Sequence, residues 1–173
     1  MKPTILKGNV WYITDQDGKL INDIDTDMIY HNAYLAVTDV SSMGKYAFGN
    51  LDLWKDFPSK VKKGDIIIAG ENFGSGSSRQ HAVDCFLALG VSLIIARSIG
   101  AIYKRNAINS GMPILEFPEI VKYKIQSGDI LEIDLEKAHI KNITTDEELR
   151  GAKSFSRVQM NIYQAGNLFA YMK

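Results

Sequence analysis

The sequence predicts an α/β fold in which parallel strand–helix–strand units and an added β-hairpin share one mixed sheet. Two short runs rich in β-branched residues, Ile66–Ala69 and Ser92–Ala96, each precede a segment with helical periodicity. This alternation is typical of parallel crossover units. Residues 131–136 instead alternate apolar and acidic side chains, which indicates an antiparallel strand with one exposed face. We expect a single domain over residues 1–173, because this length is usual for one domain.

The individual elements follow from local patterns in chain order. Residues 8–13 are the first expected strand, and a polar, acidic loop follows at 22–27. Glycines bound the strand at 66–69, and Gly90 and Gly111 stand where two helices are expected to end. Further strands are expected at 92–96, 113–117, 131–136 and 139–143, and helices at 78–89, 99–109 and 156–165, the last one capped by Ser156.

Residues 28–58 show no clear periodicity, because their aromatic side chains are scattered among polar ones. We expect a loop-rich segment here, with one short helix near Val40–Tyr46. Phe48, Trp54 and Phe57 are open to three interpretations: core residues, contacts to a partner subunit, or contacts within a homo-oligomer.

The composition argues against several classes of function. Basic and acidic residues both number 20 and the formal net charge is +0, so no broad surface for nucleic acid or anionic membrane is expected. Cys85 is the one cysteine, and one thiol can form no internal disulfide and cannot hold an iron–sulfur cluster. No apolar stretch reaches the length of a signal core or a membrane span, so a cytoplasmic location is expected.

A glycine-rich loop, Gly70–Arg79, joins the strand at 66–69 to the next helix and is the strongest candidate site. Gly74 and Gly76 allow a tight turn and a close approach to a ligand. The expected helix start offers free backbone N–H groups to an anion, and Arg79 can clamp a carboxylate. The loop lacks the Gly-Lys-Ser/Thr of a phosphate-binding loop and the third glycine of a dinucleotide fingerprint. The simpler interpretation is that Ser77 only caps the helix and Arg79 is a solvated charge.

Residues Glu71–Ala82 (ENFGSGSSRQHA) resemble the signature of the swivel domain of the aconitase superfamily. More narrowly, they are similar to the stand-alone small subunits of 3-isopropylmalate dehydratase and homoaconitase. The segments Asp25–Asp27, Tyr34–Ala36 and Tyr103–Gly111 match the same family in the same order. The match extends over roughly residues 8–169, nearly the whole chain.

The resemblance implies a swivelling β/β/α domain and a hydro-lyase that isomerises an alkylmalate by dehydration and rehydration. The most favoured reaction converts 2-isopropylmalate to 3-isopropylmalate, a step of leucine biosynthesis. The family's chemistry implies a [4Fe–4S] cluster that acts as a Lewis acid and is held by the large subunit. This chain is therefore expected to carry no metal or cofactor and to be active only with that subunit.

The family's site residues carry over onto the matching positions of this chain. Ser77 corresponds to the catalytic base, which removes a proton from the carbon next to a carboxylate. Ser78 and Arg79 correspond to contacts with the substrate carboxylate and the oxyanion. Asp27 and Arg105 correspond to supporting residues, in addition to the two loop glycines. Two positions depart from the family pattern: Gln80 replaces the usual glutamate, and Ser75 stands where many relatives have cysteine.

The family also implies which residues select the substrate. Leu35 and Ala36 correspond to positions that contact the variable group of the acid. An arginine at the position of Ala36 goes with an additional carboxylate, whereas a small apolar residue goes with an alkyl group. Burial of an alkyl group is favourable by about 0.8 kcal/mol per methylene, whereas a buried carboxylate needs a charged partner. We therefore expect isopropylmalate, with dimethylmalate or homoaconitate as alternatives.

Two further readings of the sequence are weaker. His81 and Cys85 are four residues apart on one expected helix, but two ligands alone rarely make a metal site. The acidic loop at 22–27 resembles the start of a calcium loop, but Met28 and Tyr34 occupy positions where glycine and glutamate are needed. The main alternative to an enzyme subunit is a non-enzymatic, anion-binding module built on the same loop.

Overall fold

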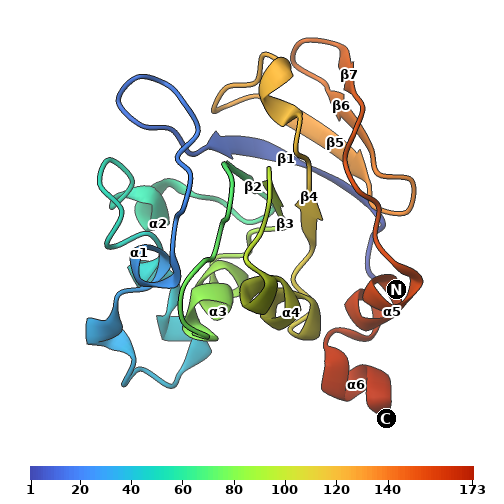
Figure 1. Ribbon diagram of the computed structural model, residues 1–173. Helices are drawn as coiled ribbons and strands as arrows, with labels where there is room; N and C mark the ends of the chain where they lie inside the picture. Colours follow the sequence, from blue (N-terminus) through green and yellow to red (C-terminus); the bar gives the residue numbers. More distant parts are fainter.

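The computed structural model describes residues 1–173 and contains one curled, seven-stranded sheet with the order β4-β3-β2-β1-β5-β6-β7 (Figure 1). Strands β1 to β4 are parallel, and β5 to β7 continue the sheet antiparallel from the other edge of β1. The strands are β1 Ile5–Tyr12, β2 Ile66–Ala69, β3 Leu93–Ala96, β4 Ile114–Glu116, β5 Ile130–Asp134, β6 His139–Asn142 and β7 Glu147–Leu149.

The parallel strands separate two apolar cores, because their side chains alternate between the faces of the sheet. In β2, Ile67 and Ala69 belong to the core on one face, and Ile66 and Ile68 to the core on the other. Every residue of β2 and β3 is buried, as is usual for parallel strands covered on both sides. The β-branched runs of the sequence therefore predicted these two strands correctly.

Helices cover one face of the parallel strands and the antiparallel strands curl over the other (Figure 1). On the helical face lie α3 (His81–Ala88) and α4 (Ala101–Asn109), which contribute Phe86 and Tyr103 to the larger core. The second core includes Leu131 and Ile133 from β5. This β/β/α arrangement confirms the predicted mixed sheet with parallel crossover units and an added hairpin. The hairpin is extended by a third strand, β7, which was not expected from the sequence.

The segment after β1 packs into the larger core through short helical turns. It contains α1 (Thr26–Ile29), α2 (Phe57–Lys60) and 3₁₀ turns at 32–34, 40–42 and 44–46. The short helix expected near Val40–Tyr46 is thus two consecutive 3₁₀ turns. Phe48 and Phe57 are fully buried in the core, and Trp54 packs against it while its Nε1–H donates to the Thr14 carbonyl at 2.8 Å.

The chain ends in two helices, α5 (Arg157–Ala165) and α6 (Leu168–Met172). Ser156 caps α5 as expected, since its side chain accepts a hydrogen bond from the Gln159 N–H. The N-terminal segment lies against α5 (Figure 1), where the Tyr163 hydroxyl donates to the Pro3 carbonyl at 2.7 Å. No helix of the protein, α1 to α6, has both the length and the apolar character that a bilayer crossing requires.

Candidate functional site

The candidate site lies at the carboxyl edge of the parallel strands, where the loops after β1, β2 and β3 meet. The loop after β2, residues 70–79, lies between the acidic loop at 22–27 and the turn at 97–100. The Gly74 N–H donates to the Ile24 carbonyl at 2.7 Å, and the Gly100 N–H donates to the Phe73 carbonyl at 2.8 Å. Ligand sites of open α/β sheets are typically found at this edge.

Two glycines shape the middle of the loop at 70–79. Gly74 and Gly76 have backbone φ angles of +77° and +97°, which residues other than glycine rarely adopt. A Cβ atom on Gly74 would also collide with the buried Tyr103 ring. The tight turn expected at both glycines is therefore confirmed, and their close approach to a ligand stays a prediction.

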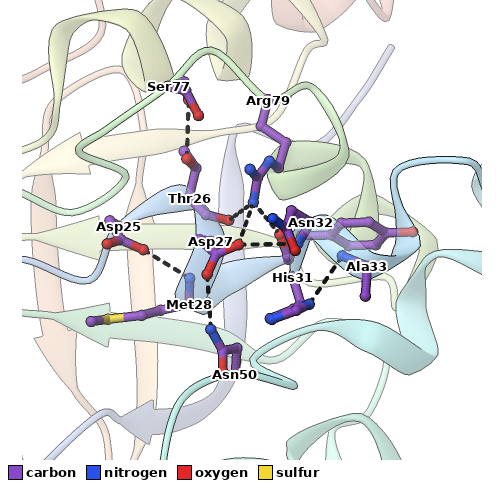
Figure 2. A network of polar contacts seen from close by, with 11 residues as sticks. Asp25, Thr26, Asp27, Met28, His31, Asn32, Ala33, Asn50, Ser77 and Arg79 are labelled. Atoms are coloured by element: carbon purple, nitrogen blue, oxygen red, sulfur yellow. Dashed lines mark hydrogen bonds and ion pairs between the residues drawn. The ribbon is translucent and has the colours of Figure 1, made fainter.

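The acidic loop continues into α1 and forms the opposite wall of the site. Asp25 caps α1, because its Oδ1 accepts the Met28 N–H at 2.8 Å. Buried Thr26 joins the two loops: its N–H donates to the Ser75 carbonyl at 2.9 Å, and its hydroxyl donates to the Ser77 carbonyl at 3.0 Å (Figure 2). The backbone of Ser77 is thus fixed from within this chain.

The Arg79 side chain reaches back to Asp27 and to the end of α1 (Figure 2). Its Nη1 is 3.1 Å from Asp27 Oδ1 and donates to the Tyr30 carbonyl at 2.7 Å. Burial alone would raise the pKa of Asp27, but the Asn32 N–H and the Arg79 guanidinium outweigh it and hold that pKa below its ordinary value. Asp27 Oδ2 also accepts from the Asn50 side chain at 2.9 Å.

The remaining nitrogens of Arg79 are unpartnered but not fully enclosed, although its side chain is only 11% exposed. Its Nε and Nη2 make no hydrogen bond within the chain, and no buried side-chain nitrogen or oxygen of this protein is without a partner. One edge of the guanidinium is therefore fixed by Asp27 and by backbone carbonyls, while its other donors are available to an external anion.

Ser77 and Ser78 are exposed beside this arginine. The Ser78 hydroxyl accepts a hydrogen bond from Asn106 Nδ2 of α4 at 3.2 Å. The expectation that the helix begins at Ser78 is wrong, because α3 begins at His81 after Gln80. Contacts to Thr26, Asn106 and Asp27 hold residues 77–79 in a non-helical conformation, so these residues form the wall of the site rather than the first helical turn.

The predicted substrate-selecting residues lie in a tight turn, which is connected to the same region. The Val37 N–H donates to the Tyr34 carbonyl at 3.1 Å, which places Leu35 and Ala36 at the centre of the turn, both exposed. His81 Nε2 is 3.0 Å from the Val37 carbonyl. The turn is thus attached to the first residue of the helix that follows Arg79.

Arg105 takes no part in the hydrogen bonds and ion pairs of the candidate site. The side chain of Arg105 is exposed on α4 and makes no hydrogen bond or ion pair within the chain, so its supporting role stays a prediction. Its neighbour Asn106 is the residue that contacts the loop. Gln80 donates to Asp84 at 3.0 Å and to Ser110 at 2.7 Å, and so ties α3 to the end of α4. The contacts made by Thr26, Asn106 and His81 were not predictable from local sequence patterns, although all three residues lie inside the segments that carried the resemblance.

The chain offers no group of His, Cys, Asp and Glu side chains that could hold a metal ion. Cys85 is fully buried in α3, and burial raises the pKa of its thiol far above the ordinary value. His81 is bonded to a carbonyl rather than paired with Cys85. The residues of this chain therefore do not fit an iron–sulfur cluster.

Comparison with known proteins gives a consistent result. The sequence-family model of the aconitase C-terminal domain matches residues 19–120 of this chain. The small subunit of 3-isopropylmalate dehydratase from Caldicellulosiruptor saccharolyticus is 46% identical over 90% of this chain and 87% of its own length. The isopropylmalate/citramalate isomerase small subunit of Methanocaldococcus jannaschii is 43% identical over 98% and 95%. A crystal structure of 3-isopropylmalate dehydratase from M. jannaschii superimposes with a TM-score of 0.83 and 36% identity, over 97% of this chain and 93% of that one.

Proposed function

Since this chain belongs to the aconitase C-terminal domain family and, within it, to the small subunits of 3-isopropylmalate dehydratase, we propose that it supplies the proton-abstracting half of that active site. The reaction interconverts 2-isopropylmalate and 3-isopropylmalate by loss and return of water. The observation that carries this proposal is the loop at 77–79, where two exposed serine residues directly precede an arginine whose Nε and Nη2 make no hydrogen bond within the chain.

In this proposal Ser77 removes the proton from the carbon next to a carboxylate. A serine hydroxyl is a weak base unless its alkoxide is stabilised, and a nearby cation provides such stabilisation. Arg79 is suited to this role, because Asp27 and the Tyr30 carbonyl orient one nitrogen and leave the others free. Ser78 and the free edge of Arg79 bind the substrate carboxylate.

The departing hydroxyl group needs an acid that this chain does not provide. A [4Fe–4S] cluster would supply Lewis-acid chemistry there, and we propose that the large subunit holds it, because the thiol of Cys85 is buried and protonated. The small subunit is then active only in complex with the large one. We further propose that it works in the cytoplasm.

The substrate preference is proposed from the turn that presents Leu35 and Ala36. Neither side chain can pair with a carboxylate, and both are exposed beside the site, where an alkyl group could cover them. A citramalate activity is a second candidate, because the M. jannaschii relative at 43% identity is named for both acids. The two acids differ by two carbons in the alkyl group, so their ratio measures how closely the turn contacts it.

The decisive experiment is an anaerobic assay of this chain with its reconstituted large subunit, following the unsaturated intermediate from 3-isopropylmalate, citramalate, dimethylmalate and homocitrate. Turnover that requires both proteins and is lost in Ser77→Ala supports the proposal and ranks the substrates. A complex with an intact cluster that turns over none of these acids would contradict it and would favour an anion-binding module.

A further inference from the structure

The turn of residues 34–37 is held from three sides, although its central residues are exposed. The Tyr34 carbonyl accepts the Val37 N–H at 3.1 Å and the hydroxyl of Tyr30 at 3.0 Å. Tyr30 itself is fully buried at the end of α1 and is therefore a rigid support. A surface turn without such support would sample several conformations.

An aromatic stack provides the second support. The rings of Tyr34 and Tyr46 are stacked with centroids 4.0 Å apart and an interplanar angle of 15°. The ring of Tyr30 meets both of them edge to face. Such pairs typically contribute about 0.5–1.5 kcal/mol beyond their buried area, so they restrain the near end of the turn.

His81 provides the third support, at the far end of the turn. Its Nε2 lies 3.0 Å from the Val37 carbonyl, and because a carbonyl only accepts, Nε2 carries the hydrogen. Its ring centroid is 5.1 Å from that of Tyr30. His81 is also the first residue of α3, two positions after Arg79, so it connects the far end of the turn to the loop proposed to bind and deprotonate the substrate. Tyr30 connects the near end, because its carbonyl accepts from Arg79 and its hydroxyl donates to the Tyr34 carbonyl.

We propose that His81 is a positioning residue for substrate selection: it sets the distance between the Leu35–Ala36 turn and the loop at 77–79. This inference rests on the proposed function. With the hydrogen bond present, the turn lies at a fixed place against the alkyl group of the substrate. Without it, the turn moves and the larger alkyl group loses contacts that a methyl group never made. The effect therefore falls on discrimination between acids rather than on proton abstraction.

The test compares His81→Leu, which keeps bulk but removes the donor, with His81→Gln, which keeps an N–H of similar reach. Each variant is assayed as the complete complex with 3-isopropylmalate and with citramalate. For His81→Leu we expect KM for 3-isopropylmalate to rise about tenfold, a typical value for lost contacts of one or two methylenes. KM for citramalate and both kcat values should change less than about twofold, and His81→Gln should restore the preference.

His139→Gln is the matched control, because His139 is an exposed histidine on β6 that contacts Glu148 rather than the site. Hydrogen exchange of the complexes gives an independent measurement: the Val37 amide should exchange faster in His81→Leu, while the amides of β3 stay unchanged. Equal losses on both acids, or an unchanged preference with faster exchange, would overturn the inference. A wild-type complex that turns over neither acid would overturn the proposed function and this inference with it.

Discussion

The ion pair between Asp27 and Arg79 should make a pH-dependent contribution to the free energy of unfolding. The substitution Asp27→Asn should remove this contribution. The two side chains are 41% and 11% exposed, with Asp27 Oδ1 3.1 Å from Arg79 Nη1. In the variant, Arg79 keeps the Thr26 and Tyr30 carbonyls as acceptors, so it does not become an unpaired buried charge. The cost is therefore that of a partly solvated pair.

The size of this contribution to the free energy of unfolding, and its direction with pH, follow from these contacts. Because Asp27 is more than a third exposed, solvent screening limits the pair to about 0.5–1 kcal/mol of unfolding free energy. Its pKa in the folded protein is held below the ordinary value by Asn32 and Arg79. A carboxyl group whose pKa is lowered by folding stabilises the folded state at pH values above its unfolded-state pKa of about 3.9. This stabilisation is lost as the pH falls through the pKa of the folded state.

Thermal unfolding of wild type and Asp27→Asn across pH 3 to 7 measures the effect. We expect the variant to melt about 1–4 °C lower at pH 7, and the difference to shrink below about pH 4. Asp23→Asn is the matched control, because Asp23 lies in the same loop and accepts only from Asn72, with no cationic partner. A difference that is as large at pH 3 as at pH 7 would refute the electrostatic explanation, as would no difference at pH 7.

Four further outcomes are expected. Ser77→Ala should lower turnover of the complex at least about a hundredfold, as is typical for loss of a general base, while the melting temperature stays within about 1 °C because the side chain is exposed. Ala36→Arg should lower kcat/KM for 3-isopropylmalate and raise it for an acid with a third carboxylate. If the ratio of kcat/KM between the two acids stays the same as in the wild type, the proposed selectivity is contradicted. Gly74→Ala should cost about 2–5 kcal/mol in chemical denaturation, because φ is +77° and the new Cβ meets Tyr103. Cys85 should resist alkylation in the folded chain and react after unfolding, since it is fully buried and its pKa is raised.

The fold was predictable where local pattern and tertiary burial agree. The runs in β2 and β3 are wholly buried, so their apolar, β-branched sequences identified them directly. β7 escaped prediction because it is only Glu147–Leu149, with a single buried side chain and no alternation to detect. α6 escaped for the same reason: Leu168–Met172 has no buried residue and is shorter than two helical turns.

The residues proposed for the site could be named from the sequence, but their contacts could not. The loop glycines indicated a tight turn, and both have the expected positive φ. The helix start was misplaced because Ser77 was taken as a helix cap and Ser78 as the first helical residue, yet the Ser78 hydroxyl is bonded to Asn106 of another helix and α3 begins at His81. No local rule indicates that contact, since the two residues are 28 positions apart. The ion pair of Arg79 with Asp27 likewise joins positions 52 apart.

If residues 77–79 act as proposed, the distribution of their contacts explains why they need a partner subunit to be reactive. The backbone of residues 73–77 is hydrogen-bonded to the acidic loop on one side and to the turn at 97–100 on the other, so the position of Ser77 is set before any partner docks. Its side chain, however, is exposed, and a hydroxyl surrounded by water keeps an ordinary, very weak basicity. Removing that water requires a surface to close over Ser77 and Arg79, and only then does the guanidinium act at low dielectric. In the proposed function, the small subunit therefore contributes the positions of these groups, and docking of the large subunit is the step that makes them reactive.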